Sequence, residues 1–473
     1  GAGRRRTLLM KRALSLLLLL LAPACEWLLN TDQIPPPIPT ELTYPTNPAV
    51  YTRGWPILEN TPSHDGGPVT SYAISSPPPA GLSFDTTTGI VSGTPAVLSP
   101  AAAFTVIAAN ARGSATATLA ITVVNGVVSS GGTHNCALVN GGVQCWGGGS
   151  SGQLGNGSAT DRSVPVKVSG IASGALAIAA GNLHTCAIIN GGVQCWGYNG
   201  DGELGNSSTT SSLVPIPVSN LPTSGAQDVA AGKFHSCAVI NGGAWCWGGN
   251  GVGQLGNNST TPSLVPVPVS GLTSGVQAIS AGEYHSCALV NGGVQCWGLN
   301  VNGQLGNNST RDSSAPVPVS GLTSGVQAIS AGGNHTCALV NGEARCWGDG
   351  SSGQLGNNST AMSPVPVPVS GLASGVQGIA AGGSHTCAAV DGGVQCWGLN
   401  VNGQLGNNST AMSPVPVQVS GLASGVQGIA AGQSHTCAVA GGGVQCWGNG
   451  NSGQLGNSST AGSLVPVLVS PWQ

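Results

Sequence analysis

Charged side chains are scarce in this chain of 473 residues and make up only 6% of it. Lys and Arg together number 12 against 15 acidic residues, the pI is about 6.2, and no basic patch stands out. Proteins that bind nucleic acid neutralise its phosphates with clustered Lys and Arg. The composition therefore excludes nucleic acid as a partner.

The chain also lacks the usual signatures of catalytic and cofactor sites. It has no Ser, His and Asp arrangement, no glycine–lysine phosphate loop and no metal-binding motif. The run GQLGNNST is rich in glycine, but it has no lysine and no helix is expected after it. We therefore expect no enzyme activity, no cofactor and no metal.

A unit of about 50 residues occurs seven times and dominates the chain. Each unit carries His-x-Cys, a second Cys nine residues after the first, and then Trp-Gly. The units have no apolar period of 3.6 residues and are rich in Gly, Val, Ser and Pro, which indicates β-strands. Seven units of this length are typical of a β-propeller with four-stranded blades. The repeated histidines are His134, His184, His235, His285, His335, His385 and His435.

The two cysteines of each unit are expected to face each other across a hairpin. In HTCAIINGGVQCWG at 184–197, Asn190-Gly191 is a strong signal for a two-residue type I′ turn. Counting outward from this turn pairs Cys186 with Cys195 at a non-hydrogen-bonded position, where Cα atoms lie about 4.5 Å apart and a disulfide fits. We therefore predict seven cross-strand disulfides: Cys136–Cys145, Cys186–Cys195, Cys237–Cys246, Cys287–Cys296, Cys337–Cys346, Cys387–Cys396 and Cys437–Cys446.

A metal site is an alternative interpretation of the same residues. His-x-Cys places both side chains on one face of a strand, and the opposed Cys could supply a third ligand. Seven identical three-ligand sites would be unusual. We favour histidines that form buried hydrogen bonds at the start of each strand.

Residues 1–25 have the features of a signal peptide, because a basic pair precedes the run LSLLLLLLAPAC. Ala22-Pro23-Ala24-Cys25 resembles a bacterial lipobox, which implies that Cys25 is lipidated and anchors the protein to a membrane. Ordinary cleavage before Cys25 is the alternative. Met10 is a candidate start of translation. Export to an oxidising compartment agrees with the paired cysteines.

A different region separates the signal peptide from the repeats. Residues 26–40 are expected to form a proline-rich linker, and the short alternating runs of 41–124 indicate a small β-sandwich. The stretch PAGLSFDTTTGIVSGTP at 79–95 resembles the immunoglobulin-like domain of bacterial surface proteins, which implies a cadherin-like fold. Such domains often bind calcium, but Glu59, Asp65 and Asp85 form no recognisable ligand run. We interpret this region as a spacer.

The repeated units resemble the regulator-of-chromosome-condensation repeat. The likeness is clear at Ala281–Asn307, AGEYHSCALVNGGVQCWGLNVNGQLGN, and extends over about 125–470. It implies an all-β fold with a seven-bladed β-propeller at 125–473, after the Ig-like β-sandwich. It implies no single activity, because some members exchange guanine nucleotides on a small GTPase and a secreted bacterial relative inhibits β-lactamases. The paired cysteines and the constant spacing, which leaves no room for a protruding β-wedge, argue against an exchange factor.

Three zones vary among the seven units: the pair before each His, the residues after Cys-Trp-Gly, and the patch before Val-Pro-Val. The expected strand order brings all three to one rim of the propeller. Binding residues collect on loops that a rigid scaffold carries, and aromatic and charged side chains anchor interfaces. We predict that a partner binds at Tyr198, Asp201, Glu203, Lys233, Phe234, Glu283, Tyr284, Arg311 and Asp312. The constant tryptophans are expected to pack between blades.

These features favour an exported, lipid-anchored propeller of the cell envelope that binds a protein or glycan at the cell surface. The alternative is a structural or adhesive surface module without a discrete ligand. Natural sheets avoid bare edge strands. We therefore also expect the last strand, Leu464–Val469, to pair into the blade that carries His134 and so close the ring.

Overall fold

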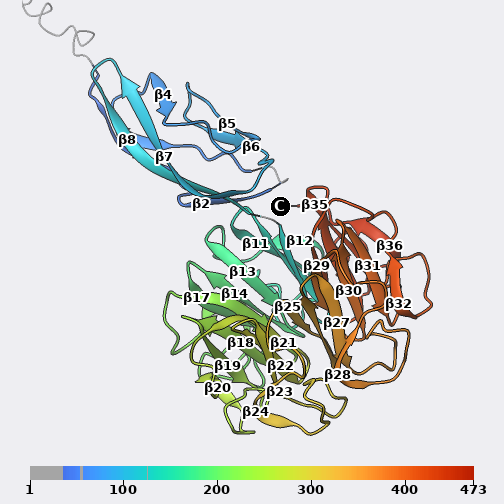
Figure 1. Cartoon of the computed structure of the whole chain (residues 1–473). Coiled ribbons are helices and arrows are strands. Elements are labelled where there is room, and N and C mark those ends of the chain that lie inside the picture. The colour runs from blue at the N-terminus through green and yellow to red at the C-terminus, as the bar shows by residue number, and fades with distance from the viewer. Residues whose placement is uncertain (1–35, 54–56, 125, 473) are drawn as a thin grey trace, which may run out of the picture.

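The computed structural model describes residues 36–53, 57–124 and 126–472. Every regular element in these ranges is a β-strand. Figure 1 shows two parts, an elongated N-terminal module and a ring of sheets. The predicted signal peptide and Cys25 lie outside the described residues, as does most of the proline-rich linker. No helix in the described ranges could cross a membrane.

The ring is a propeller of seven four-stranded sheets, which confirms the predicted fold. Each blade uses four consecutive strands that pair with their sequence neighbours. Blade 1 contains β9 (Val127–Ser130), β10 (His134–Val139), β11 (Gly142–Gly147) and β12 (Arg162–Lys167). Blade 2 contains β13 (Ala175–Ala180), β14 (His184–Ile189), β15 (Gly192–Gly197) and β16 (Ser212–Pro217), and blade 3 contains β17 (Ala226–Ala231), β18 (His235–Ile240), β19 (Gly243–Gly248) and β20 (Ser263–Pro268).

The other four blades repeat this pattern. Blade 4 contains β21 (Val276–Ala281), β22 (His285–Val290), β23 (Gly293–Gly298) and β24 (Ser313–Pro318), and blade 5 contains β25 (Val326–Ala331), β26 (His335–Val340), β27 (Glu343–Gly348) and β28 (Ser363–Pro368). Blade 6 contains β29 (Val376–Ala381), β30 (His385–Val390), β31 (Gly393–Gly398) and β32 (Ser413–Gln418), and blade 7 contains β33 (Val426–Ala431), β34 (His435–Ala440), β35 (Gly443–Gly448) and β36 (Ser463–Leu468).

The hairpin between the second and third strands of each blade carries the predicted disulfide. In blade 2, Asn190 and Gly191 have φ angles of 51° and 83°, which a type I′ turn requires at both central positions. This turn aligns Cys186 with Cys195. All seven pairs form, with Cα–Cα distances of 4.0 to 4.1 Å. Each lies buried within the blade core.

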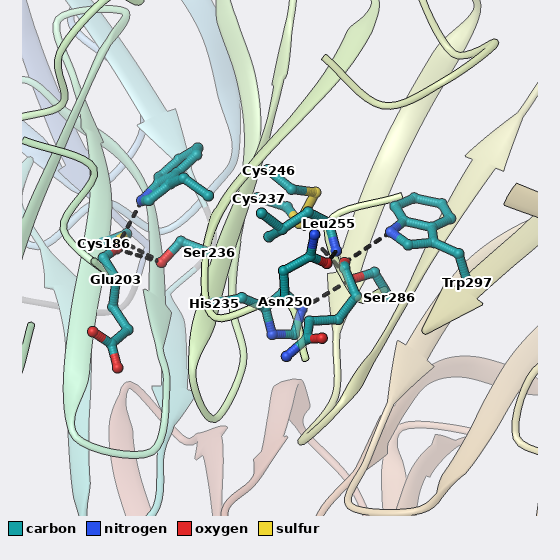
Figure 2. Close-up of a disulfide and its surroundings, with 12 residues drawn as sticks. Cys186, Glu203, His235, Ser236, Cys237, Cys246, Asn250, Leu255, Ser286 and Trp297 are labelled. Atoms are coloured by element: carbon teal, nitrogen blue, oxygen red, sulfur yellow. Dashed lines mark hydrogen bonds between the residues drawn. A yellow bond between two sulfur atoms is a disulfide. The ribbon is translucent and has the colours of Figure 1, made fainter. Parts of the chain in front are cut away.

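A chain of hydrogen bonds joins each blade to the next. Between blades 3 and 4, His235 Nε2 lies 2.8 Å from Ser286 Oγ, and the Ser286 hydroxyl donates to the Gln254 carbonyl at 3.0 Å. The same carbonyl accepts the Trp297 indole N–H at 2.9 Å, as Figure 2 shows. Because the serine hydrogen goes to the carbonyl, His235 must donate its Nε2 proton to the serine oxygen. His235 Nδ1 is buried without a hydrogen-bond partner among the described residues, and burial lowers the pKa of His235 to about 4. The imidazole is therefore neutral, with Nδ1 as the unprotonated nitrogen.

This relay occurs at all seven contacts between blades, which we call seams. Thr or Ser supplies the hydroxyl at six seams. Asn135 replaces it where blade 7 meets blade 1: its Oδ1 accepts from His435 at 2.8 Å, and its Nδ2 donates to the Gln454 carbonyl at 2.7 Å. The histidines are thus buried hydrogen-bonding residues, as favoured above. Within the described residues, no cluster of His, Cys, Asp and Glu is arranged to hold a metal.

The ring closes without exchanging a strand, so the predicted pairing of the last strand was wrong. Strand β36 pairs with β35 of its own blade. The outer edge of blade 1 is occupied by β12, which follows β11 after one loop and pairs with it. The seam is instead closed by the Trp146 indole, which donates to the Gln454 carbonyl at 3.0 Å. The ring of Trp472 packs edge-on against Trp146, with centroids 5.5 Å apart.

The N-terminal module confirms the predicted Ig-like domain and has its own core. A four-stranded sheet of order β2-β8-β7-β4 and two short two-stranded sheets surround it. Its buried side chains include Tyr51, Phe104 and Ile121. The strands are β1 (Pro39–Thr43), β2 (Ala49–Thr52), β3 (Ser63–Gly66), β4 (Ser71–Ile74), β5 (Leu82–Phe84), β6 (Val91–Gly93), β7 (Ser99–Asn110) and β8 (Gly113–Val124).

This module is hydrogen-bonded to the hairpin turn of blade 1. Thr52 N–H donates to Asn140 Oδ1 at 3.1 Å, and Asn140 N–H donates to Thr52 Oγ1 at 3.0 Å. In blade 2 the corresponding Asn190 N–H donates to Gly174, in the connector before the blade. Thr52 of the Ig-like module therefore accepts the turn N–H of blade 1, whereas a connector residue accepts the equivalent N–H of blade 2.

We predict that the propeller loses stability steeply as the pH falls from about 7.5 to 5.5. Burial lowers the pKa of the seven seam histidines to about 3 or 4, whereas the unfolded chain takes up protons near the ordinary value of about 6.5. Above that value the stability is fully present. At pH 5.5 each histidine should lower the free energy of unfolding by on the order of 1 kcal/mol, so that the seven together lower it by several kcal/mol.

Urea unfolding at several pH values measures this loss. Burial raises the pKa values of the acids Glu203 and Asp228, so these two residues stabilise the fold as the pH falls. The seven seam histidines outnumber them, and the net effect is a loss of stability. A free energy of unfolding that stays constant over this range would show that the imidazoles are not held neutral.

Candidate partner-binding rim

The strand order brings the variable zones to one end of the propeller. Turns between first and second strands and loops between third and fourth strands lie at this end, and the Asn-Gly turns lie at the other. We call the first end the variable rim. At its centre the inner strand ends surround an axial cavity of about 100 Å³. Alanines and glycines form most of its wall, together with Ser130, Asn182, Lys233, Glu283 and Gln433.

Four of the predicted residues form one cluster where blade 3 meets blade 4 on this rim. Lys233 and Phe234 come from the β17–β18 turn, and Glu283 and Tyr284 come from the β21–β22 turn. Lys233 Nζ lies 2.9 Å from Glu283 Oε2. The two aromatic rings have centroids 5.5 Å apart. We call these four residues the seam cluster.

The lysine of the seam cluster also lies against both rings. Its Nζ is 5.7 Å from the Phe234 ring centroid and 5.3 Å from that of Tyr284, within the range of cation–π attraction. Partial burial opposes the charge of Lys233, but the hydrogen bond and the negative charge of Glu283 outweigh it and raise its pKa. About a quarter of each charged side chain remains exposed. The cluster is thus electrically balanced, half-buried and accessible from the rim.

Blade 2 places two further predicted residues on the same rim. Tyr198 and Asp201 are half-buried in the loop that follows β15. Gly249 of blade 3 stands between this loop and the seam cluster: a Cβ built on it would lie 3.2 Å from Phe234 Cβ and 3.6 Å from Asp201 Cβ. Because Gly249 has no side chain, the blade 2 loop and Phe234 can approach each other closely here.

Glu203 is not on the surface, so its prediction as a contact residue was wrong. Its side chain has no exposed area, and its Oε2 accepts the Asp201 N–H at 2.9 Å. Burial raises the pKa of Glu203 to about 7, although backbone hydrogen bonds, including that from Asp201, oppose the rise. Sequence reasoning grouped it with the rim because charged residues are usually exposed.

Arg311 and Asp312 lie in the β23–β24 loop and have exposed side chains. Asp312 Oδ1 accepts the Asn300 N–H at 2.7 Å, and the Arg311 carbonyl accepts Asn300 Nδ2 at 2.9 Å. Asp161 holds the corresponding loop of blade 1 in the same way, by accepting the Gly149 N–H. In the described part of the chain, no hydrogen bond, ion pair or ring contact joins Arg311 or Asp312 to the seam cluster.

Asn182 and Gln433 belong to the variable pair before each His but are absent from the predicted contact residues, and both line the axial cavity. In their own units they occupy the position of Lys233 and Glu283. The alignment of units therefore carries the signal, but neither residue is charged or aromatic.

Family models match both parts of the chain. The model described as RCC1-like domain matches residues 105–388. Models described as Regulator of chromosome condensation (RCC1) repeat match 376–404 and 391–439. The model described as "Putative Ig domain" matches 37–124. A search of curated proteins found no match.

Solved structures with the same propeller fold come from yeast and human proteins. Yeast RCC1 (Prp20), in its crystal structure with Kap60, is 24% identical, with a TM-score of 0.63, over 70% of this chain and 84% of that one. Prp20p from Saccharomyces cerevisiae, whose structure was reported with its binding properties to Gsp1p and histones, is 24% identical, with a TM-score of 0.62, over 70% and 86%. Human WBSCR16 is 25% identical, with a TM-score of 0.62, over 69% and 93%.

The structure predicts unequal effects on stability when two adjacent residues of the blade 4 loop are substituted. Asp312→Ala removes the acceptor of the Asn300 N–H and should lower the free energy of unfolding by about 1 kcal/mol. Arg311→Ala removes an exposed side chain and should change it by less than about 0.5 kcal/mol. Urea unfolding of both variants tests the assignment. Equal effects of the two changes would contradict a loop-holding role for Asp312.

Proposed function

Because the chain belongs to the family of RCC1-like domains, we propose that it is an exported, lipid-anchored propeller that binds a protein through its variable rim. The family match covers residues 105–388, and an RCC1-like propeller fold supports a role in protein binding. The observation that favours this rim is the seam cluster. It gathers two aromatic side chains and an ion pair in a chain with only 6% charged residues.

The chemistry of the cluster favours a protein partner. Aromatic side chains at the centre of an interface supply much of its binding energy. Lys233 and Glu283 neutralise each other, so they provide polar hydrogen-bonding groups without a net charge. The axial cavity beside them is walled mainly by alanine and glycine and adds a small recess to the same surface. A surface of this kind suits a mixed apolar and polar protein face and does not suit a polyanion.

The attachment of the Ig-like module supports the same choice of rim. Thr52 is bonded to Asn140 at the Asn-Gly turn of blade 1, which lies at the end opposite the variable rim. An anchor that precedes the Ig-like module would therefore approach the propeller from the Asn-Gly side. The variable rim would face away from the membrane and remain accessible to a partner.

Replacing the seam cluster tests the proposed interface. Lys233-Phe234 and Glu283-Tyr284 are both changed to Gly-Ser, the pair that blade 6 carries at Gly383-Ser384. Folding should persist, because another blade already accommodates this pair. Loss of the aromatic anchors should reduce partner binding about thirtyfold or more, measured by affinity capture from envelope extracts and then by titration of the captured protein.

A matched control places conservative changes on the opposite rim. Thr273→Ala and Thr323→Ala alter exposed connector residues whose counterparts Ala373 and Ala423 are already alanine. This variant should capture the partner as the unchanged chain does. Binding that survives the cluster replacement but not the control would place the interface on the Asn-Gly side.

The lipid anchor is tested separately by Cys25→Ser. The change removes the only thiol that the seven disulfides leave over, and the protein should move from the membrane fraction to the soluble fraction. Detergent partitioning and immunoblotting measure this shift. A variant that stays in the membrane fraction would contradict lipidation at Cys25.

A further inference from the structure

The loop between β15 and β16 holds a buried acid at a position that is otherwise glutamine. Glu203 occupies this position in blade 2, and its backbone carbonyl accepts both the Ser236 hydroxyl at 2.9 Å and the Trp247 indole at 2.7 Å. It is therefore the carbonyl of the seam relay between blades 2 and 3. The other six units carry Gln153, Gln254, Gln304, Gln354, Gln404 and Gln454.

The glutamines show what this position accommodates. The side-chain oxygen of Gln153 accepts the Ser151 N–H at 2.9 Å, and that of Gln254 accepts the Val252 N–H at 3.1 Å. Glu203 Oε2 makes the same bond to the Asp201 N–H, at 2.9 Å. One carboxyl oxygen thus replaces the amide oxygen of glutamine in the same place.

The second carboxyl oxygen of Glu203 is buried and has no hydrogen-bond partner among the described residues. It corresponds to the amide nitrogen of the glutamines, which is likewise unpartnered in Gln153, Gln304 and Gln404. A protonated carboxylic acid matches the shape and the neutrality of the glutamine amide. An ionised carboxylate would bury a charge without compensation, which is strongly unfavourable.

Among the residues that the structure describes, no cation is paired with Glu203 to compensate such a charge. On its own loop, Asp201 adds negative charge. His184 of blade 2 reaches this seam through Ser236, and His235 of blade 3 bonds Ser286 at the next seam. Burial holds the pKa of these imidazoles at about 3 and 4, so both are neutral. Lys233, at the end of the blade 3 turn, is paired with Glu283.

We propose that Glu203 is a proton-controlled latch, which seats the 198–206 loop between blades 2 and 3 when protonated and releases it when ionised. Figure 2 shows its carboxyl group directed away from the Ser236 hydrogen bond. Release displaces both the Glu203 backbone carbonyl of the seam relay and the loop in which Tyr198 and Asp201 lie on the variable rim. The effect on a partner rests on the proposed function of that rim, whereas the latch itself does not.

Hydrogen exchange of the exported protein measures the latch without any partner. Peptides that cover 198–206 are followed from about pH 6 to about pH 8.5, with Glu203→Gln as the reference at each pH. This variant carries the residue of the other six blades, so it folds and stays latched at every pH. Because the pKa of Glu203 is about 7 in the seated loop and is expected near its ordinary value in the released loop, the ratio of exchange in the unchanged chain to that in E203Q should rise by up to about tenfold per pH unit below about pH 7 and level off above it.

A reciprocal variant tests whether the acid is sufficient. Gln254→Glu places the same group between blades 3 and 4 and should confer the same pH dependence on the loop that carries residue 254, while Gln404→Asn, which adds no acid, should not. A ratio that stays constant over the pH range would overturn the latch. So would a rise in E203Q itself, or a Q254E variant without pH dependence. Partner capture is read separately, so its failure counts against the proposed function alone.

Discussion

The hydrogen-bond relay at each seam is the interaction on which the rest of this propeller depends. In it, a neutral histidine of one blade, a hydroxyl and a tryptophan of the next, and one backbone carbonyl satisfy one another away from water. Buried polar groups are costly unless paired, so all four groups must be present at every seam. This requirement explains why the units repeat their His, their hydroxyl or amide and their Trp with so little variation.

The relay also dictates residues that make none of its bonds. Gly256 follows the relay residue Gln254 by two positions and has a φ of +67°, and a Cβ on it would lie 2.7 Å from Trp297 Nε1. A side chain there would meet both an unfavourable backbone conformation and the next blade's indole. The run QLG is therefore a packing element between blades and not a ligand-binding loop.

Seams that are satisfied internally leave the rim loops free to differ. The seam cluster uses this freedom: its four side chains stand just before the buried histidines of blades 3 and 4, on turns that the relay holds in place. Glu203 differs from the rim residues, because it replaces glutamine at the position whose backbone carbonyl belongs to the relay. Its carboxyl group keeps the acceptor that the loop requires but adds a proton that can leave. The same scaffold thus carries a candidate binding surface on its rim and a titratable group beneath it.

Contacts within a unit could be derived from the sequence, because they are local. The Asn-Gly turn and the nine-residue spacing placed Cys186 opposite Cys195, and the repeat resemblance gave the number of blades. The adjacency of Phe234 and Tyr284 followed from their equal positions in neighbouring units. Contacts between units were decided only by the tertiary structure. The Trp196 indole reaches a carbonyl 43 residues away and the Trp146 indole one 308 residues away. Neither the burial of Glu203 nor the closure by Trp472 has a local signal, since both depend on which loop each blade meets when the ring closes.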